Sequence, residues 1–127
     1  MDIFTTHFEG EYNTLYRNEG NGSFADISAE TSLVKPSQVH VGFGTGFFDA
    51  DNDGDLDLYT VRGEGESNSL YLNTGGRFDE VAAGVEGAAS STGAAWADFD
   101  NDGDLDIAIH NLDSTPSLLR NDTQNNN

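Results

Sequence analysis

The chain has 127 residues, a formal net charge of −18 and only five Lys plus Arg residues. This charge argues against nucleic acid and anionic membrane surfaces as partners, since both need a basic face, and it favours attraction of cations. Cysteine is absent and no apolar run is long enough to cross a membrane, so we expect no disulfide scaffold, no thiolate-bound metal and no membrane insertion.

The start of the chain resembles a later part of it. The sequence DIFTTHFEGEYNTLYRN at residues 2–18 aligns without a gap with DLYTVRGEGESNSLYLN at residues 57–73, and this alignment places Asp2 on Asp57. The following segments, GNGSFADI and GGRFDEV, match after one deletion, and SLLRND near the end resembles SLYLNT. The chain therefore contains a repeat of about 50 residues, present roughly two and a half times.

Each repeat is predicted to contain four short strands. In the complete repeat these are VGFGTGFF, LDLYTV, NSLYLN and RFDEVA, with turn signals every eight to twelve residues. Sustained helical periodicity is absent. A period near 50 with four strands indicates a β-propeller blade, and a β-sandwich with accidental self-similarity is the alternative. The predicted fold is therefore all-β, with ten strands in blades of four antiparallel strands.

The repeats divide the chain into four parts. We expect a partial blade with strands two to four at 1–34, a complete blade at 35–84, a partial blade at 85–122 and a polar tail at 123–127. A closed propeller needs four to eight blades. Either the chain is cut from a longer propeller, or several copies assemble and cover each other's open strand edges.

Two aspartate loops lie between the first and second predicted strands of a blade. FFDADNDGDLDLYT (47–60) and WADFDNDGDLDIAI (96–109) place aspartates at alternate positions between apolar runs. We predict that each loop binds one ion through three side chains, one backbone carbonyl (of Asp55 or Asp104) and a closing aspartate. The predicted metal residues are Asp49, Asp51, Asp53, Asp55 and Asp57 in the first loop, and Asp98, Asp100, Asp102, Asp104 and Asp106 in the second.

The chemistry of these loops favours Ca²⁺. Two carboxylates about 4 Å apart repel by roughly 4 kcal/mol at an effective dielectric near 20, so four of them require a counter-charge. Calcium takes 6–8 oxygen ligands, whereas Mg²⁺ prefers to keep several waters. Gly54 and Gly103 allow the sharp turn after the third ligand, and Leu56 and Leu105 are expected to point into the sheet. A solvated acidic turn without metal is the alternative.

An EF-hand is excluded on two counts, although the first half of its loop is the same. That motif needs a bidentate Glu at loop position 12, where this chain has Thr60 and Ile109, and it needs flanking helices where strands are predicted. Dockerin-type loops fail for the same reasons. Thrombospondin-type calcium repeats need cysteines, which the chain lacks.

The string VGFGTGFFDADNDGDLDLYT, followed by NSLYLNTGGRFDEV, resembles the FG-GAP/VCBS repeats of integrin α subunits and many secreted bacterial proteins. It is most similar to the repeats of proteins that carry an ASPIC/UnbV domain. The resemblance implies a propeller with calcium in the loop between strands one and two, serving stability first. The GAP tripeptide is replaced by TVR and IHN, and the FG at Phe43 and Gly44 becomes TG at Thr92 and Gly93, so the match is closer to VCBS than to integrin.

Three hypotheses for function follow. The first is a calcium-binding module for binding or adhesion to a protein or carbohydrate; it would be secreted, at the cell surface or periplasmic. The second is a structural unit that self-associates through open blade edges. The third is part of a propeller lyase or hydrolase. The sequence argues against an enzyme. His7, His40 and His110 do not align in the repeat, and no convergent acid–base set remains if the aspartates bind calcium.

Overall fold

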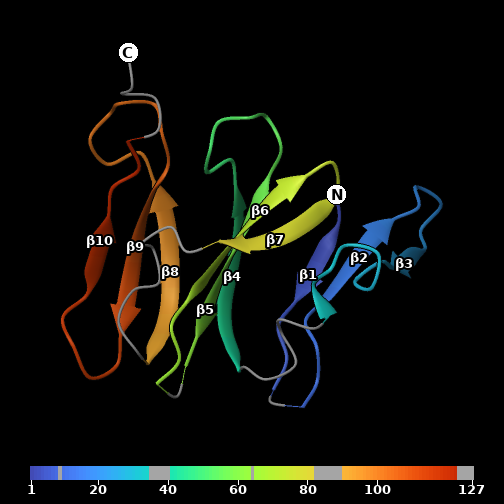
Figure 1. Ribbon diagram of the computed structural model, residues 1–127, viewed down its shortest axis with the longest axis horizontal. Coiled ribbons are helices and arrows are strands. Elements are labelled where there is room, and N and C mark those ends of the chain that lie inside the picture. Colours follow the sequence, from blue (N-terminus) through green and yellow to red (C-terminus); the bar gives the residue numbers. More distant parts are fainter. Residues whose placement is uncertain (9, 35–40, 64, 82–89, 123–127) are drawn as a thin grey trace.

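In the computed structural model, the described residues form ten β-strands in three antiparallel sheets. The sheets stand side by side in Figure 1 and are called blades 1, 2 and 3 in chain order. This confirms the predicted all-β fold of propeller blades. No helix among the described residues is long and apolar enough to span a membrane. The residues described are 1–8, 10–34, 41–63, 65–81 and 90–122.

Blade 2 has four strands in the order β4-β5-β6-β7. Their bounds are Gly42–Phe48 for β4, Asp57–Arg62 for β5, Ser69–Thr74 for β6 and Arg77–Val81 for β7. The strand β5 is buried along its whole length, because it pairs on both edges and has a neighbouring blade on either face. A buried strand of this kind explains the continuous apolar character of LDLYTV.

Blades 1 and 3 have three strands each, in the orders β1-β2-β3 and β10-β9-β8. Blade 1 contains β1 (Ile3–Thr5), β2 (Thr14–Asn18) and β3 (Phe24–Asp26), and blade 3 contains β8 (Ser91–Ala97), β9 (Asp106–Asn111) and β10 (Ser117–Leu119). By alignment, β1 and β9 correspond to β5. The segments 35–40 and 82–89 lie outside the described residues, so the predicted blade boundaries stay predictions.

The register of the strands repeats from blade to blade. Equivalent pairs lie opposite each other in all three sheets: Ile3 and Tyr16, Leu58 and Tyr71, Ile107 and Leu119. The first strands β4 and β8 also carry a register shift at the same place. The gapless alignment in the sequence is therefore a structural equivalence.

The core lies between the blades. Leu15 of blade 1 packs with Leu58, Tyr71 and Phe78 of blade 2 in one cluster. A second cluster joins blade 2 to blade 3 and contains Phe48, Ala50, Tyr59, Val61, Leu70, Ile107 and Ile109. Each blade is therefore stabilised chiefly by burial of apolar area against its neighbour.

Trp96 of β8 closes the junction of blades 2 and 3. Its indole ring lies 6.0 Å from the ring of Phe48 and 6.2 Å from that of Tyr59, between centroids. The ring packs directly onto the backbone at Gly46, where an added Cβ would lie only 2.4 Å from it. Glycine is needed at position 46 because the next blade approaches so closely.

The expected inward orientation of Leu56 and Leu105 is wrong. Their side chains are 56% and 39% exposed. Both leucines come just before a strand begins and lie in the loop, outside the paired part of the sheet. The buried anchor of each loop is the aspartate that follows.

Candidate metal centre

Each aspartate loop joins the first two strands of a blade, β4 to β5 and β8 to β9. The backbone of Gly54 and Gly103 has φ angles of 96° and 99°, and that of Asn52 and Asn101 has 60° and 63°. Glycine and asparagine are the residues that adopt this left-handed region most readily. The DNDG sequence thus folds the loop back on itself and turns alternate side chains toward one point.

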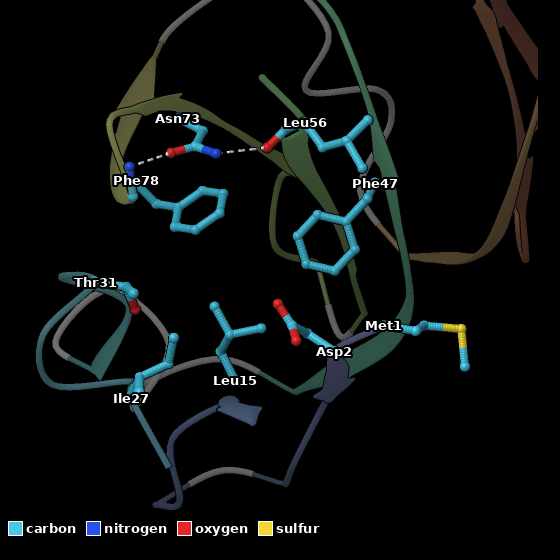
Figure 2. A pocket seen from close by; sticks show the side chains of 10 residues that line it. Met1, Asp2, Leu15, Ile27, Thr31, Phe47, Leu56, Asn73 and Phe78 are labelled. Atoms are coloured by element: carbon cyan, nitrogen blue, oxygen red, sulfur yellow. Dashed lines mark hydrogen bonds between the residues drawn. The ribbon is translucent and has the colours of Figure 1, made fainter. Parts of the chain in front are cut away.

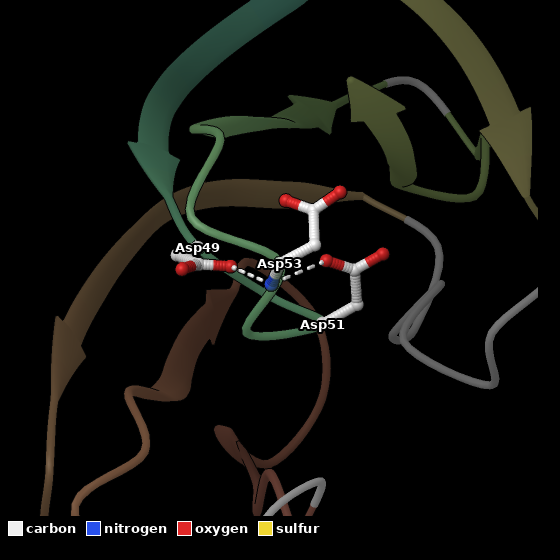
Figure 3. A group of neighbouring side chains, drawn as sticks. All are labelled: Asp49, Asp51 and Asp53. Carbon is white, nitrogen blue, oxygen red and sulfur yellow. Dashed lines mark hydrogen bonds between the residues drawn. The ribbon is translucent and has the colours of Figure 1, made fainter. Parts of the chain in front are cut away.

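In the first loop, Asp49, Asp51 and Asp53 come together. Each offers a carboxylate oxygen within 4.8 Å of the others. The backbone N–H of Asp53 donates to Asp49 Oδ1 at 3.2 Å and to Asp51 Oδ1 at 3.3 Å (Figure 3). The backbone of Gly54 donates to Asp49 Oδ2 at 3.1 Å. The loop backbone therefore orients these carboxylates, and their charges crowd one small region.

Asp57 is fully buried beneath this group. Its Oδ2 accepts the backbone N–H of Ala50 at 2.7 Å, and its Oδ1 accepts that of Asn73 at 2.8 Å. Burial raises the pKa of Asp57 above its usual 3.8, and the two N–H donors oppose that rise. The carboxylate thus ties the start of the loop to the end of β6.

The second loop has the same framework. Asp106 Oδ2 accepts the N–H of Phe99 at 2.9 Å, and Oδ1 accepts that of Asn121 at 2.8 Å. Here Asp98, Asp100 and Asp106 each offer an oxygen within 4.8 Å of the others. A second group of this kind contains Asp100, Asp102 and Asp122.

Arg120 distinguishes the second loop from the first. Its guanidinium lies 3.4 Å from Asp100 and 2.8 Å from Asp122. Loss of hydration and the charge of Asp102 raise the pKa of Asp100, while Arg120 acts in the opposite direction. The corresponding residue of blade 2 is Leu72, so the first loop has no such cation at this position.

The fourth aspartate of each loop has a different environment in the two loops. Asp55 is exposed, whereas Asp104 is 2% exposed. The side chain of Asn52, in the first loop, donates to Asp104 Oδ1 at 3.2 Å. The two loops are therefore neighbours and are linked by a hydrogen bond between blades.

Sequence reasoning named the aspartates of both loops. The structure brings together Asp49, Asp51 and Asp53 in the first loop, and Asp98, Asp100 and Asp106 in the second. Asp102 groups with Asp100 and Asp122, whereas Asp55, Asp57 and Asp104 belong to none of these groups. Sequence reasoning missed Asn52, Arg120 and Asp122. The signal for the last two was present in the alignment of SLLRND with SLYLNT, which puts Asp122 beside Asn121 at the end of the third strand. The signal for Asn52 was its repetition as Asn101.

A family model described as an FG-GAP-like repeat matches the chain twice, at residues 1–60 and 49–109. The two matches overlap in the first aspartate loop and together include both loops. No curated protein matches the chain.

Proposed function

Because the chain belongs to the FG-GAP-like repeat family, we propose that it is a calcium-binding module of propeller blades. The observation that carries this proposal is the convergence of Asp49, Asp51 and Asp53 within 4.8 Å in one loop, with a second acidic cluster, of Asp98, Asp100 and Asp106, in the loop of the next blade. Like charges at this separation repel, and a divalent cation would remove the repulsion.

The donor set fits calcium. In the first loop the side chains of Asp49, Asp51 and Asp53 and the backbone carbonyl of Asp55 would hold the ion. Asp57 would close the site, because a carboxylate oxygen that accepts one N–H keeps a second lone pair. Asp98, Asp100, Asp102, Asp104 and Asp106 would act in the same way in the second loop. All are hard oxygen donors, the type that calcium prefers.

We further propose that the module acts outside the cell, or in the periplasm, in binding or adhesion to a protein or carbohydrate rather than in catalysis. Calcium modules of extracellular proteins work with dissociation constants of roughly 10⁻⁴–10⁻³ M, and extracellular calcium fills such sites. The bound ions would hold each loop against its blade and fix the surface that the loops form.

Thermal unfolding in calcium and in chelator tests this proposal. We expect calcium to raise the melting temperature of the wild type, and to raise that of the double variant Asp53→Ala, Asp102→Ala far less. Magnesium at the same concentration is the control for ionic strength. Equal stabilisation of both proteins by calcium would contradict the proposed sites.

A second candidate function is self-assembly through open blade edges. Leu118 of β10 is 56% exposed, and among the described residues β10 pairs only with β9. Absolute mass from light scattering tests this candidate. A discrete oligomer in calcium that dissociates in chelator would support it, whereas a monomer in both conditions would contradict it.

A further inference from the structure

We propose that the cleft between blades 1 and 2 binds an extended segment of one kind: the first strand and aspartate loop of another FG-GAP-like repeat. The occupant pairs with β1 and inserts an aromatic side chain between the blades. This inference goes beyond calcium binding and does not depend on it. It rests on a comparison of two equivalent junctions within the same molecule.

The junction of blades 2 and 3 shows how such a segment is held. Phe48, the last residue of β4, and Ala50, two residues further along in the loop, are buried between the two blades. The Ala50 N–H donates to Asp57 at 2.7 Å, and its carbonyl accepts the side-chain N–H of Asn121 at 3.2 Å. Two residues later, Asn52 reaches Asp104.

The junction of blades 1 and 2 presents the corresponding receiving groups. Asp2 corresponds to Asp57, Asn73 to Asn121, and Asp55 to Asp104. The Asp2 carboxylate accepts the N–H of Asn18 at 2.9 Å, just as Asp57 accepts that of Asn73, but no described residue supplies Asp2 with a donor equivalent to Ala50. Asn73 donates within its own blade instead, to the Leu56 carbonyl at 3.0 Å.

A cavity of about 460 Å³ lies where the aromatic side chain would go. In Figure 2, Asp2, Leu15 and Ile27 of blade 1 border it on one side and Phe47, Leu56 and Phe78 of blade 2 on the other. Phe47 meets Phe4 edge-on at 5.9 Å, as Trp96 meets Tyr59 at 6.2 Å. Trp96 also contacts Phe48, whereas the described residues provide Phe47 with no counterpart of Phe48.

Exposure of the lining residues agrees with a missing occupant. Leu56 is 56% exposed at this junction, and its equivalent Leu105 is 39% exposed at the filled one. Asp55 is exposed while Asp104 is buried. The apolar residue Leu56 at this cavity is therefore more exposed than its equivalent, Leu105, at the junction of blades 2 and 3.

The edge of β1 supplies the backbone contacts. Within the described part of the chain, β1 pairs with β2 alone, whereas β5 and β9 pair on both edges. An open edge offers unpaired N–H and C=O groups to an added strand. The equivalent pair β4 and β5 is antiparallel, so the added strand would run antiparallel to β1.

The cavity, Asp2 and Asp55 together determine which sequence the bound segment must have. The cavity needs an aromatic residue at the position of Phe48, Asp2 needs a backbone N–H two residues later, and Asp55 needs a donor such as the Asn52 side chain. The sequence GFGTGFFDADND of residues 42–53 meets all three requirements. A small apolar molecule would fill the cavity but leave Asp2 and Asp55 without these partners.

Binding of a labelled synthetic peptide with the sequence of residues 42–53 tests the proposal by fluorescence anisotropy. The titration is made in chelator at high salt, which screens repulsion between two acidic partners. We expect saturable binding, weakened at least tenfold in the peptide with Phe48→Ala and weakened several-fold by Asp2→Ala in the protein. Asp113→Ala, an exposed acidic change in blade 3, is the matched control and should leave binding unchanged.

The Phe48→Ala change is made in the peptide, so it cannot alter the folding of the protein. Equal binding of the wild-type and Phe48→Ala peptides would overturn the proposal, as would absence of binding. Self-association of the protein that Asp2→Ala abolishes, without peptide binding, would also overturn the proposal, because the edge would then accept some other surface of a second copy. Protein with Asp53→Ala and Asp102→Ala should still bind the peptide, so failure of calcium binding and failure of strand binding are distinguishable.

Discussion

The carboxylate of Asp57 accepts the backbone N–H of Asn73 at 2.8 Å. The same bond recurs in the other two blades, at 2.9 Å between Asp2 and Asn18 and at 2.8 Å between Asp106 and Asn121. It is present in blade 1, where the described residues contain no aspartate loop. This bond is therefore part of the blade framework and does not require an aspartate loop, although Asp57 and Asp106 would also close the proposed metal sites.

Replacement of Asp57 should lower stability even without metal. Asp57→Ala leaves the buried N–H of Ala50 and the half-buried N–H of Asn73 without their acceptor, and loss of a partner for a buried donor costs about 1–3 kcal/mol. Asp53→Ala removes an exposed carboxylate and should change the unfolding free energy in chelator little. Urea denaturation in chelator measures both variants. Equal unfolding free energies for the two would show that Asp57 has no framework role.

Because Trp96 packs closely on Gly46, Gly46→Ala should lower stability more than Gly44→Ala in the same strand. Gly46→Ala places a Cβ 2.4 Å from the indole ring, and such overpacking typically costs about 1–3 kcal/mol. Gly44→Ala in the same strand is the control, because its Cβ would lie 3.7 Å from Val61, an ordinary contact. Thermal unfolding followed by the fluorescence of Trp96, the single tryptophan, compares them.

Arg120 should weaken calcium binding at the second loop, since its guanidinium lies beside Asp100 and Asp122. Arg120→Leu introduces the residue found at the equivalent position of blade 2, and we expect the calcium affinity of the second loop to rise several-fold. The control is Arg17→Leu, at the same position of blade 1, where the arginine pairs with Glu19. Calorimetric titration resolves the effect. An unchanged affinity in Arg120→Leu would mean that the arginine moves away when calcium binds.

The pH dependence of stability should change sign with calcium. Burial raises the pKa of Asp57 in the folded chain above the usual 3.8 of the unfolded chain. Between the unfolded and the folded pKa, Asp57 is therefore protonated more often in the folded chain. The contribution of Asp57 to the unfolding free energy in chelator should therefore fall as pH rises from about 3.8 through its higher folded pKa. In calcium the unfolding free energy should rise over the same range, because bound carboxylates must be ionised.

Asp26 provides the control for this pH dependence. Hydrogen bonds from Ser28 lower the pKa of Asp26, so its contribution is present above about pH 4 and is lost as pH falls further, below the range in which Asp57 acts. Asp26→Ala should therefore reduce the loss of stability below about pH 4 and leave the decline above that pH unchanged. A stability in chelator that increases with pH above that value in this variant would contradict the assignment. Chemical denaturation at several pH values measures it.

The sequence predicted the repeat and the strands well because each follows from local chemistry. The alignment of residues 2–18 with 57–73 predicted the equivalence of the first two sheets, and the likeness of SLLRND to SLYLNT added the third. The aspartate spacing located both loops. The link from Asn52 to Asp104 was not predictable in this way, because it joins residues 52 positions apart. Exposure of Leu56 was also missed, since it depends on what a neighbouring blade covers and not on alternation within one strand.

Calorimetric titration of the metal-free protein with calcium tests the central claim most directly. The account predicts two calcium ions per chain for the wild type, one for Asp53→Ala, one for Asp102→Ala and none for the double variant. Retention of two ions in the double variant, or absence of calcium binding by the wild type, would contradict it.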